Sequence, residues 1–204
     1  MRRYLIGIAG IVLIAGLLLL AHAGDAPECF EGEWSLNNWT SGNSLNLKLL
    51  YRDARTRWSW GSTQSLENLH GLTREQLQSL HAPVAFVLTH DAGTFSFEGT
   101  VVMGIGHGTC RFVADPSYVT KLSALGYDTS GNADLSIAML VANDVSLAFA
   151  TEARRSGVRI DTLQDLVHLR EHGIETPYLA KVQAAGFDAL TVDQVIKLHD
   201  HGVD

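Results

Sequence analysis

The chain has two parts that differ in the spacing of their hydrophobic residues. Between about residue 30 and residue 114, apolar and polar residues alternate, most regularly at residues 45–49 and 94–98. Alternation with a period of two is typical of an antiparallel sheet with one face in the core, because successive side chains point to opposite faces. Turn sequences at residues 91–93 and 104–108 separate these runs. We therefore expect an antiparallel β domain over residues 24–114, either a small sandwich or a small open barrel.

One short helix is expected inside the β-rich part, and helical sequence follows it. Thr73 and Gln76 have the spacing of a capping box. After Asp115 the hydrophobic period changes from 2 to 3.6, and Asp115 suits the N-cap position while Pro116 suits the first position of a helix. The predicted fold class is therefore α+β, with helices over residues 115–204 and with the two parts packed against each other.

The helical part repeats itself every 29 residues. Glycines and apolar residues recur at this offset, as Gly157 and Gly186, Gly173 and Gly202, Phe149 and Tyr178, Leu166 and Val195, Leu169 and Leu198. A longer and less regular copy begins at Tyr118. A fixed period of this length indicates units that stack, because one short helix pair cannot bury its own apolar side. We expect two to three helix pairs.

Each helix pair carries start and stop signals. Helix starts are predicted at Thr176-Pro177 and at Thr191 or Asp161. A glycine after the last apolar residue supplies the left-handed conformation that ends a helix. The residues that follow these glycines are Val158, Ile174, Phe187 and Val203. All four are apolar, and we expect each to pack back on the last helical turn.

Residues 1–23 have the composition of a secretory signal peptide. Arg2 and Arg3 precede an apolar run over residues 4–21, and residues 21–23 form a small-residue cleavage signal. The run also approaches the ~18 residues that a membrane helix needs, so an uncleaved segment would act as an anchor. We expect a periplasmic or secreted protein, anchored in the membrane if residues 4–21 are retained.

The net charge limits the classes of partner, and the cysteine content allows one disulfide. The formal net charge is −7, and loss of Arg2 and Arg3 makes it −9. So acidic a chain is unsuited to nucleic acid, because nucleic-acid affinity comes mostly from neutralised phosphates. Cys29 and Cys110 both follow the cleavage signal, and a disulfide between them is plausible in an oxidising compartment. The sequence leaves open whether the two sulfurs meet.

Histidines are the clearest candidates for chemistry. Residues 168–172 read H-x-x-E-H, a zinc-peptidase signature. The sister copy has Lys197 in place of His168, and His172 and His201 each precede a helix-ending glycine, where the helix dipole favours a protonated imidazole. A zinc site also needs a third protein ligand. We expect repeated helix ends, with no catalytic residue, metal or cofactor. The remaining metal candidates are His168, His172, His199 and His201.

Two further patterns have both a structural and a functional interpretation. The Gly104–Gly108 segment, G-x-G-x-G, lacks the spacing of a dinucleotide-binding loop, and residues 109–113 alternate as a strand, so a glycine-rich hairpin is favoured. Residues 52–60 combine arginines with Trp58 and Trp60. Such a stretch can stack bases or sugars, but tryptophans in the core with arginines in water are favoured.

The repeated residues "YLAKVQAAGF…LTVDQVIKLHDHGV" resemble a helix-pair repeat of uncharacterised exported bacterial proteins. They are also similar to repeats appended to sensor metallopeptidases of the beta-lactam-receptor class, and "GTFSFEG…GIGHGTCRF" is similar to the β-rich segment that precedes those repeats. The resemblance covers roughly residues 83–204. The H-E-x-x-H helix of the peptidases is absent here, so no catalytic residue carries over. The resemblance implies an accessory or interaction module of the cell envelope.

These observations lead to one expected function and two alternatives. We expect an exported, non-enzymatic protein–protein interaction module of the cell envelope, because stacked helix pairs expose a surface suited to another chain. Membrane contact is expected only through an uncleaved N-terminal segment. The first alternative is a β domain that binds lipid or cell-wall glycan, motivated by the four tryptophans and the small-residue strands. The remote alternative is a zinc metallopeptidase.

Overall fold

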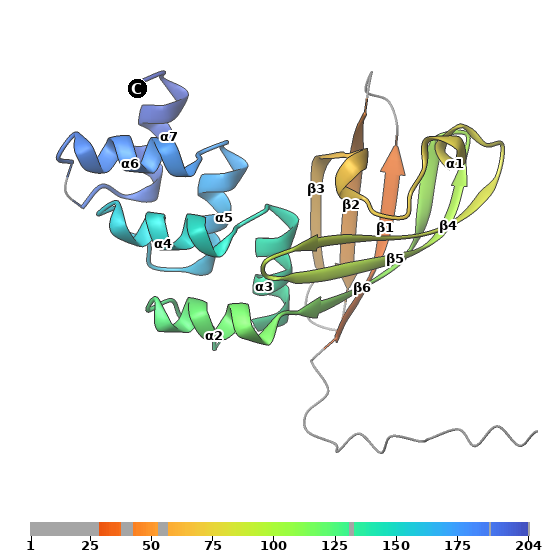
Figure 1. Cartoon of the computed structure of the whole chain (residues 1–204), viewed down its shortest axis with the longest axis horizontal. Helices are drawn as coiled ribbons and strands as arrows, with labels where there is room; N and C mark the ends of the chain where they lie inside the picture. Colours follow the sequence, from red (N-terminus) through yellow and green to blue (C-terminus); the bar gives the residue numbers. More distant parts are fainter. Residues whose placement is uncertain (1–28, 38–42, 53–56, 131–132, 188, 204) are drawn as a thin grey trace, which may run out of the picture.

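A computed structural model describes residues 29–37, 43–52, 57–130, 133–187 and 189–203. These residues run from an antiparallel sheet into a series of short helices, so the predicted α+β class is confirmed (Figure 1). The strands are β1 (Cys29–Asn37), β2 (Ser44–Arg52), β3 (Arg57–Ser65), β4 (Ala82–His90), β5 (Gly93–Val102) and β6 (Ile105–Ala114). A 3-10 turn (Leu66–Asn68) and helix α1 (Arg74–Gln78) lie between β3 and β4, and α1 begins with the predicted Thr73–Gln76 capping box.

The strands form one six-stranded sheet in the order β3-β2-β1-β6-β5-β4, with every neighbouring pair antiparallel. Each hairpin pairs strands that follow one another in sequence, while β1 in the middle of the sheet pairs with β6. The predicted sandwich is therefore wrong for the described residues, which contain a single sheet. A helix of the second half, not a second sheet, covers the core face.

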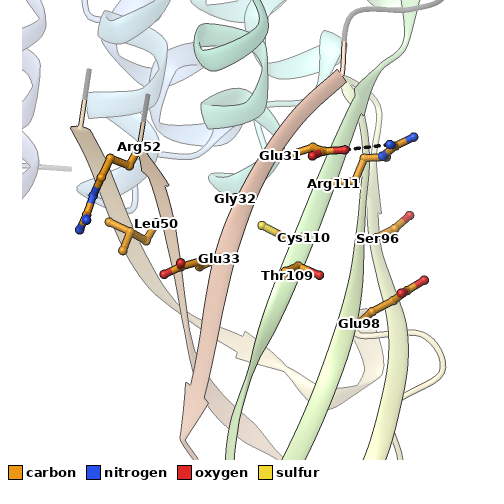
Figure 2. Close-up of a pocket in the computed structure, with 10 residues that line it drawn as sticks. All are labelled: Glu31, Gly32, Glu33, Leu50, Arg52, Ser96, Glu98, Thr109, Cys110 and Arg111. Carbon is orange, nitrogen blue, oxygen red and sulfur yellow. Dashed lines mark hydrogen bonds and ion pairs between the residues drawn. The ribbon is translucent and has the colours of Figure 1, made fainter. Parts of the chain in front are cut away.

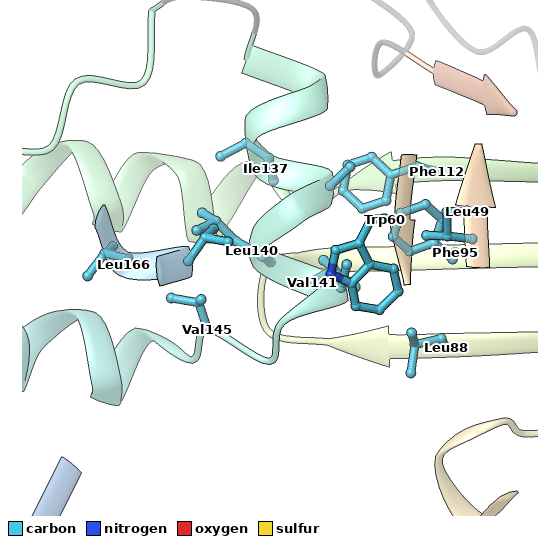
Figure 3. Packing of buried hydrophobic residues seen from close by; sticks show 14 of the residues in the cluster. Leu49, Trp60, Leu88, Phe95, Phe112, Ile137, Leu140, Val141, Val145 and Leu166 are labelled. Carbon is cyan, nitrogen blue, oxygen red and sulfur yellow. The ribbon is translucent and has the colours of Figure 1, made fainter. Parts of the chain in front are cut away.

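That helix is α3 (Ala133–Ala142), which contacts β1, β5 and β6. Figure 3 shows Val141 of α3 beside Trp60, with Phe95 and Phe112 of the sheet close by. All of these side chains belong to one hydrophobic cluster that extends from the sheet through the helices. Helix α3 is apolar on most of its circumference because it is enclosed between the sheet and the later helices. The expected packing of the two halves against each other is thereby confirmed.

The glycine-rich segment lies in the β5–β6 hairpin, as predicted. Gly106 and Gly108 face the indole of Trp34, which is 2% exposed. A Cβ atom at Gly108 would lie 2.0 Å from the Glu98 carbonyl oxygen, and one at Gly106 would lie 2.7 Å from the Trp34 ring. The indole Nε1 donates a hydrogen bond to that Glu98 oxygen at 3.0 Å. These glycines therefore make room for a core tryptophan.

Strand β6 ends at Ala114, and helix α2 begins at Pro116 with Asp115 as its N-cap, as expected. The helices are α2 (Pro116–Ala124), α3, α4 (Leu147–Arg155), α5 (Leu163–Glu171), α6 (Thr176–Ala184) and α7 (Val192–Asp200). Helices α4 and α6 begin 29 residues apart, as do α5 and α7. Helices α2, α4 and α6 contact one another in one row, and α3, α5 and α7 contact one another in a second row. The described chain thus stacks three helix pairs.

The helix ends follow the predicted signals with two corrections. Thr191 caps α7 with a capping box, but the cap of α5 is Thr162, not Asp161, and Asp165 completes its box. Helix α6 has Glu175 at the N-cap without a side-chain bond, so Thr176 is its first residue instead of its cap. The predicted glycines have φ between +68° and +84°, because only glycine adopts this conformation without steric cost.

Candidate docking surface on the helical repeats

Equivalent apolar residues of the three helix pairs differ in exposure. The residue after the first glycine of a pair is Tyr127, Val158 or Phe187, and these side chains are 4%, 5% and 43% exposed. The residue three positions after the end of the second helix of a pair is Val145, Ile174 or Val203. These side chains are 0%, 0% and 46% exposed. In the first two pairs the following pair covers these positions. In the third pair the described residues leave them open to solvent.

The open surface has the shape of a shallow apolar hollow between α6 and α7, with a volume of about 430 Å³. We call it the α6–α7 face and define it by Tyr178, Lys181, Val182, Ala185, Phe187, Leu198 and Val203. Lys181 contributes a cation at its edge. Repeat-equivalent residues at the α4–α5 level, such as Leu169 and Ser156, are 0% and 1% exposed. The α6–α7 face is therefore the same kind of surface that is buried inside the stack.

The α6–α7 face is held in place by its own hydrogen bonds. The Tyr178 hydroxyl donates to the Val203 carbonyl oxygen at 2.9 Å, and the Val203 N–H donates to the Leu198 carbonyl oxygen at 3.0 Å. The first pair has the same bond, from the Tyr118 hydroxyl to the Val145 oxygen at 2.9 Å. Because these bonds fix Val203 in the position that Val145 takes, the surface is ordered without a partner and binding loses little conformational entropy.

The structure places the candidate histidines at helix ends. Helix α5 ends at Glu171, with His172 as its C-cap and Gly173 at φ +71°. His168 is exposed on α5. His201 is the C-cap of α7. The expected repeated helix end is confirmed, since α5 does not continue through Gly173.

One of the two histidine–carboxylate contacts at the helix ends lies between repeats, and the other lies within α7. His172 Nδ1 is 3.2 Å from Asp200 Oδ2, and His199 Nδ1 is 3.6 Å from Asp200 Oδ1. The His199 ring meets the Tyr178 ring edge to face, with centroids 5.0 Å apart. Among the described residues, no group of three histidine, cysteine, aspartate or glutamate side chains is arranged to hold a metal ion. The His172–Asp200 pair therefore connects the second and third helix pairs.

A disulfide between Cys29 and Cys110, which the sequence left open, remains untested, because the structure describes the side chain of Cys110 alone. Cys110 is a buried free thiol, and burial raises its pKa to about 12. Backbone pairing places Cys110 opposite Gly32 and Cys29 opposite Val113. An offset of three residues along a strand is roughly 10 Å, whereas a disulfide requires Cα atoms within about 7 Å. The side chain of Cys29 lies outside the described residues.

The tryptophans that motivated a ligand-binding β domain are mostly in the core. Trp34 and Trp60 are buried and Trp58 is half-buried, while Arg52 and Arg57 are exposed. The structural interpretation of residues 52–60 is therefore confirmed for the described part of that stretch. Trp39 lies outside the described residues. No described tryptophan offers an exposed ring on which a sugar could stack.

A large hollow on the outer face of the sheet is lined mainly by charged and polar residues. It has a volume of about 770 Å³, and Figure 2 shows charged side chains pointing into it from several strands. The Arg111 guanidinium and the Glu31 carboxylate are 2.8 Å apart, and Glu33, Glu98 and Arg52 also line the hollow. Apolar ligands such as lipids are disfavoured there, because charged groups would lose hydration without new partners.

A polar cluster that sequence reasoning missed joins the sheet to the helices. The Asp144 carboxylate lies 3.0 Å from His90 Nδ1 and 3.2 Å from Arg170, and the hydrogen bond from His90 lowers its pKa. Asp144 has φ +51° at the position that Gly173 occupies in the next pair. The sequence signal of this cluster was that Asp144 stands at a position where the repeat otherwise has a glycine. Because the carboxylate is doubly paired, a strained backbone is tolerated here.

A second exposed apolar group lies at the β5–β6 turn. Met103 is 70% exposed and Ile105 is 51% exposed, and Leu80 is 77% exposed in the neighbouring segment. The Met103 N–H donates to the Ser79 carbonyl oxygen at 3.0 Å, which brings the two segments together. Met103 has φ +49° and Gly104 φ +82°, as a type I′ hairpin turn requires.

The helices were considered as membrane spans, and the chain was compared with known proteins. Within the described residues, no single helix has the length and apolar composition to cross a membrane; residues Leu135–Ala142 and Leu147–Arg155 meet that requirement only as a pair bent by 95°. No protein-family model, curated protein or solved structure matches this chain.

Proposed function

We propose that this protein is an exported, non-enzymatic accessory module of the cell envelope that binds another protein through the α6–α7 face. The observation that supports this proposal is the exposure of Phe187 and Val203, whose repeat equivalents are buried by a neighbouring helix pair. An ordered apolar surface with a polar edge is typical of protein-binding sites. The face consists mainly of side chains that bind by packing and take no part in reactions.

Export is the second element of the proposal, and its support is the sequence of residues 1–23. These residues lie outside the described structure. Cleavage after Ala23 would leave a mature chain that begins at Gly24. Mass spectrometry of the protein recovered from the cell envelope would measure its N-terminus. A mature N-terminus at Gly24 supports export with cleavage, whereas an intact protein confined to the cytoplasm contradicts export.

Binding through the α6–α7 face is tested by capture with matched variants. The mature chain serves as bait in envelope extract, beside Phe187→Asp and the control Leu80→Asp, which also places a carboxylate at an exposed apolar position. We expect saturable capture by the wild type and by Leu80→Asp, and at least about tenfold weaker capture by Phe187→Asp, because a buried unpaired charge opposes docking. Equal capture by all three chains, or no saturable partner together with turnover of a small molecule, would contradict the proposal.

A second candidate function is lipid binding by the β domain. The observation that favours it is the exposed apolar group of Leu80, Met103 and Ile105 at one end of the sheet. Such side chains can enter the interfacial region of a lipid layer. Co-sedimentation with phosphatidylethanolamine–phosphatidylglycerol vesicles would test it. Binding that is lost in Met103→Asp supports this function, and absence of binding by the wild type excludes it.

A further inference from the structure

The interfaces between helix pairs combine apolar packing with a repeated polar arrangement. At the interface of the second and third pairs, the Asp200 carboxylate lies 3.2 Å from the C-cap residue His172. In the same interface, a Cβ atom at Gly173 would lie 4.0 Å from His199 Cε1, so the His199 ring lies beside the glycine that ends α5, which stays exposed. The later pair thus supplies two groups to the helix end of the earlier pair.

The interface of the first and second pairs has equivalent residues at the same places. Arg170, which is equivalent to His199, pairs with Asp144, which is equivalent to Gly173. The Arg170 Nε also donates to the carbonyl oxygen of Asn143, which is equivalent to His172, at 3.3 Å. Glu171 takes the place of Asp200 and lines one hollow with Asn143. Both interfaces therefore place an arginine or histidine side chain at the helix end of the earlier pair, and at the interface of the second and third pairs a carboxylate also contacts the C-cap residue.

The third pair has the C-cap residue and the helix-ending glycine to which a following pair would contribute these side chains. His201 is the C-cap residue equivalent to His172, and Gly202 is equivalent to Gly173 with φ +68°. Both residues are exposed, as are their equivalents His172 and Gly173, and they directly precede Val203 of the α6–α7 face in sequence. The carbonyl groups at the end of α7 carry partial negative charge, so a basic group over Gly202 is favourable. A carboxylate beside His201 would pair with its imidazole ring as Asp200 pairs with that of His172.

A second copy of this chain does not supply that complement. Its α3 packs against the sheet, and the outer side of its α2 carries Ser117, Thr120 and Lys121, so the first helix pair cannot continue the stack of another copy. Two α6–α7 faces in contact would bring Lys181 and His201 from both copies into one small interface. Asp200 is already paired with His172. The charges of this face therefore call for a partner with acidic groups of its own.

We infer that the α6–α7 face binds a helix pair of the same repeat type supplied by a partner polypeptide. That helix pair buries Phe187 and Val203, places a carboxylate beside His201, and places a basic or aromatic side chain over Gly202. This inference rests on the proposed function, since it names the kind of partner that the face accepts.

The test uses a copy of residues 176–203 joined after Asp204. Asp204 stands 29 residues after Glu175, so the copy continues the repeat in register. Its own Asp200 equivalent then faces His201. Hydrogen exchange of the amides of α7 is compared in the unextended chain, the extended chain, and an extended chain with Asp200→Lys in the copy only. We expect exchange to slow by about tenfold or more on extension, and less than half of that slowing in the Asp200→Lys chain.

Three results would overturn the inference. The first is unchanged exchange of α7 on extension, and the second is equal protection by the wild-type and Asp200→Lys copies. The third is an unextended chain that is dimeric by sedimentation velocity and becomes monomeric in Phe187→Asp, which would identify a second copy as the occupant. If protein capture depends on Phe187 but the appended helix pair does not dock, the proposed function stands and only the inferred kind of partner is refuted. Docking of the appended pair without any captured protein would refute only the proposed function.

Discussion

Ile174→Ala should destabilise the protein strongly, because Ile174 lies where the second helix pair is covered by the third. Its side chain is 0% exposed. The substitution removes three carbon atoms, and at ~0.8 kcal/mol for each buried CH₂ group the transfer term is about 2.4 kcal/mol. The surrounding helices leave part of the vacated volume unfilled, which raises the expected cost to about 3 kcal/mol, within the 2–5 kcal/mol range of such substitutions.

Val203→Ala is the matched control, because Val203 occupies the equivalent position of the third pair and is 46% exposed. Two carbon atoms are lost from a side chain that is only about half buried, so the cost is about 1 kcal/mol or less. Urea denaturation followed by circular dichroism measures both values. With a slope of about 2 kcal/mol per M, Ile174→Ala lowers the midpoint by roughly 1.5 M and Val203→Ala by less than 0.5 M. Equal shifts would refute the assignment of the α6–α7 face as an uncovered stacking surface.

Three further predictions concern the sheet and its junction with the helices. Gly108→Ala should cost about 2–3 kcal/mol of unfolding free energy, because its Cβ would collide with the Glu98 carbonyl. Gly61→Ala should be neutral within about 0.5 kcal/mol in the same urea assay, because the nearest atom to its Cβ would be in the flexible Lys48 side chain, at 3.3 Å. Met103→Asn should raise the melting temperature, with a gain of about 1 kcal/mol, because asparagine tolerates the positive φ of a type I′ turn better than methionine does. The paired Asp144 carboxylate has a lowered pKa, so its contribution to stability is present above the usual value of 3.8 and is lost as the pH falls below it. Asp144→Asn should therefore lose less stability than the wild type between pH 5 and pH 3, and parallel losses would contradict that role.

The helical part was predictable because its signals are local. Capping boxes and helix-ending glycines act within four or five residues, and the 29-residue period showed which elements are alike. The errors at Thr176 and Asp161 were shifts of one residue at helix starts. At such places a neighbouring residue, Glu175 or Thr162, takes the cap position.

The arrangement of the sheet was not predictable, because it depends on contacts distant in sequence. The alternating pattern identifies strands but does not show that β1 pairs with β6, about 75 residues later. Nor does it show that α3, instead of a second sheet, covers the core face. The relation of the two cysteines was hidden for the same reason, since only the register shows that Cys110 lies opposite Gly32 and Cys29 opposite Val113.

The candidate surface was only partly visible in the sequence. The apolar residues after the glycines were recognised, among them Phe187 and Val203, and all four were expected to pack on their own helices. What the sequence could not show is that neighbouring pairs bury Val158 and Ile174, while the described residues leave Phe187 and Val203 exposed. The histidines attracted attention because of their spacing, yet the contact that links two repeats is the one between His172 and Asp200.

Site-resolved hydrogen exchange of the unmodified chain tests the central claim most directly, because it compares the equivalent amides of Val145, Ile174 and Val203. Each amide donates a hydrogen bond to the carbonyl five residues earlier, at 2.8, 3.0 and 3.0 Å, so their bonding is alike. If the helix pairs stack and the α6–α7 face is uncovered, protection decreases in that order, with Val203 at least about tenfold less protected than Ile174. Equal protection of Ile174 and Val203 would contradict the account.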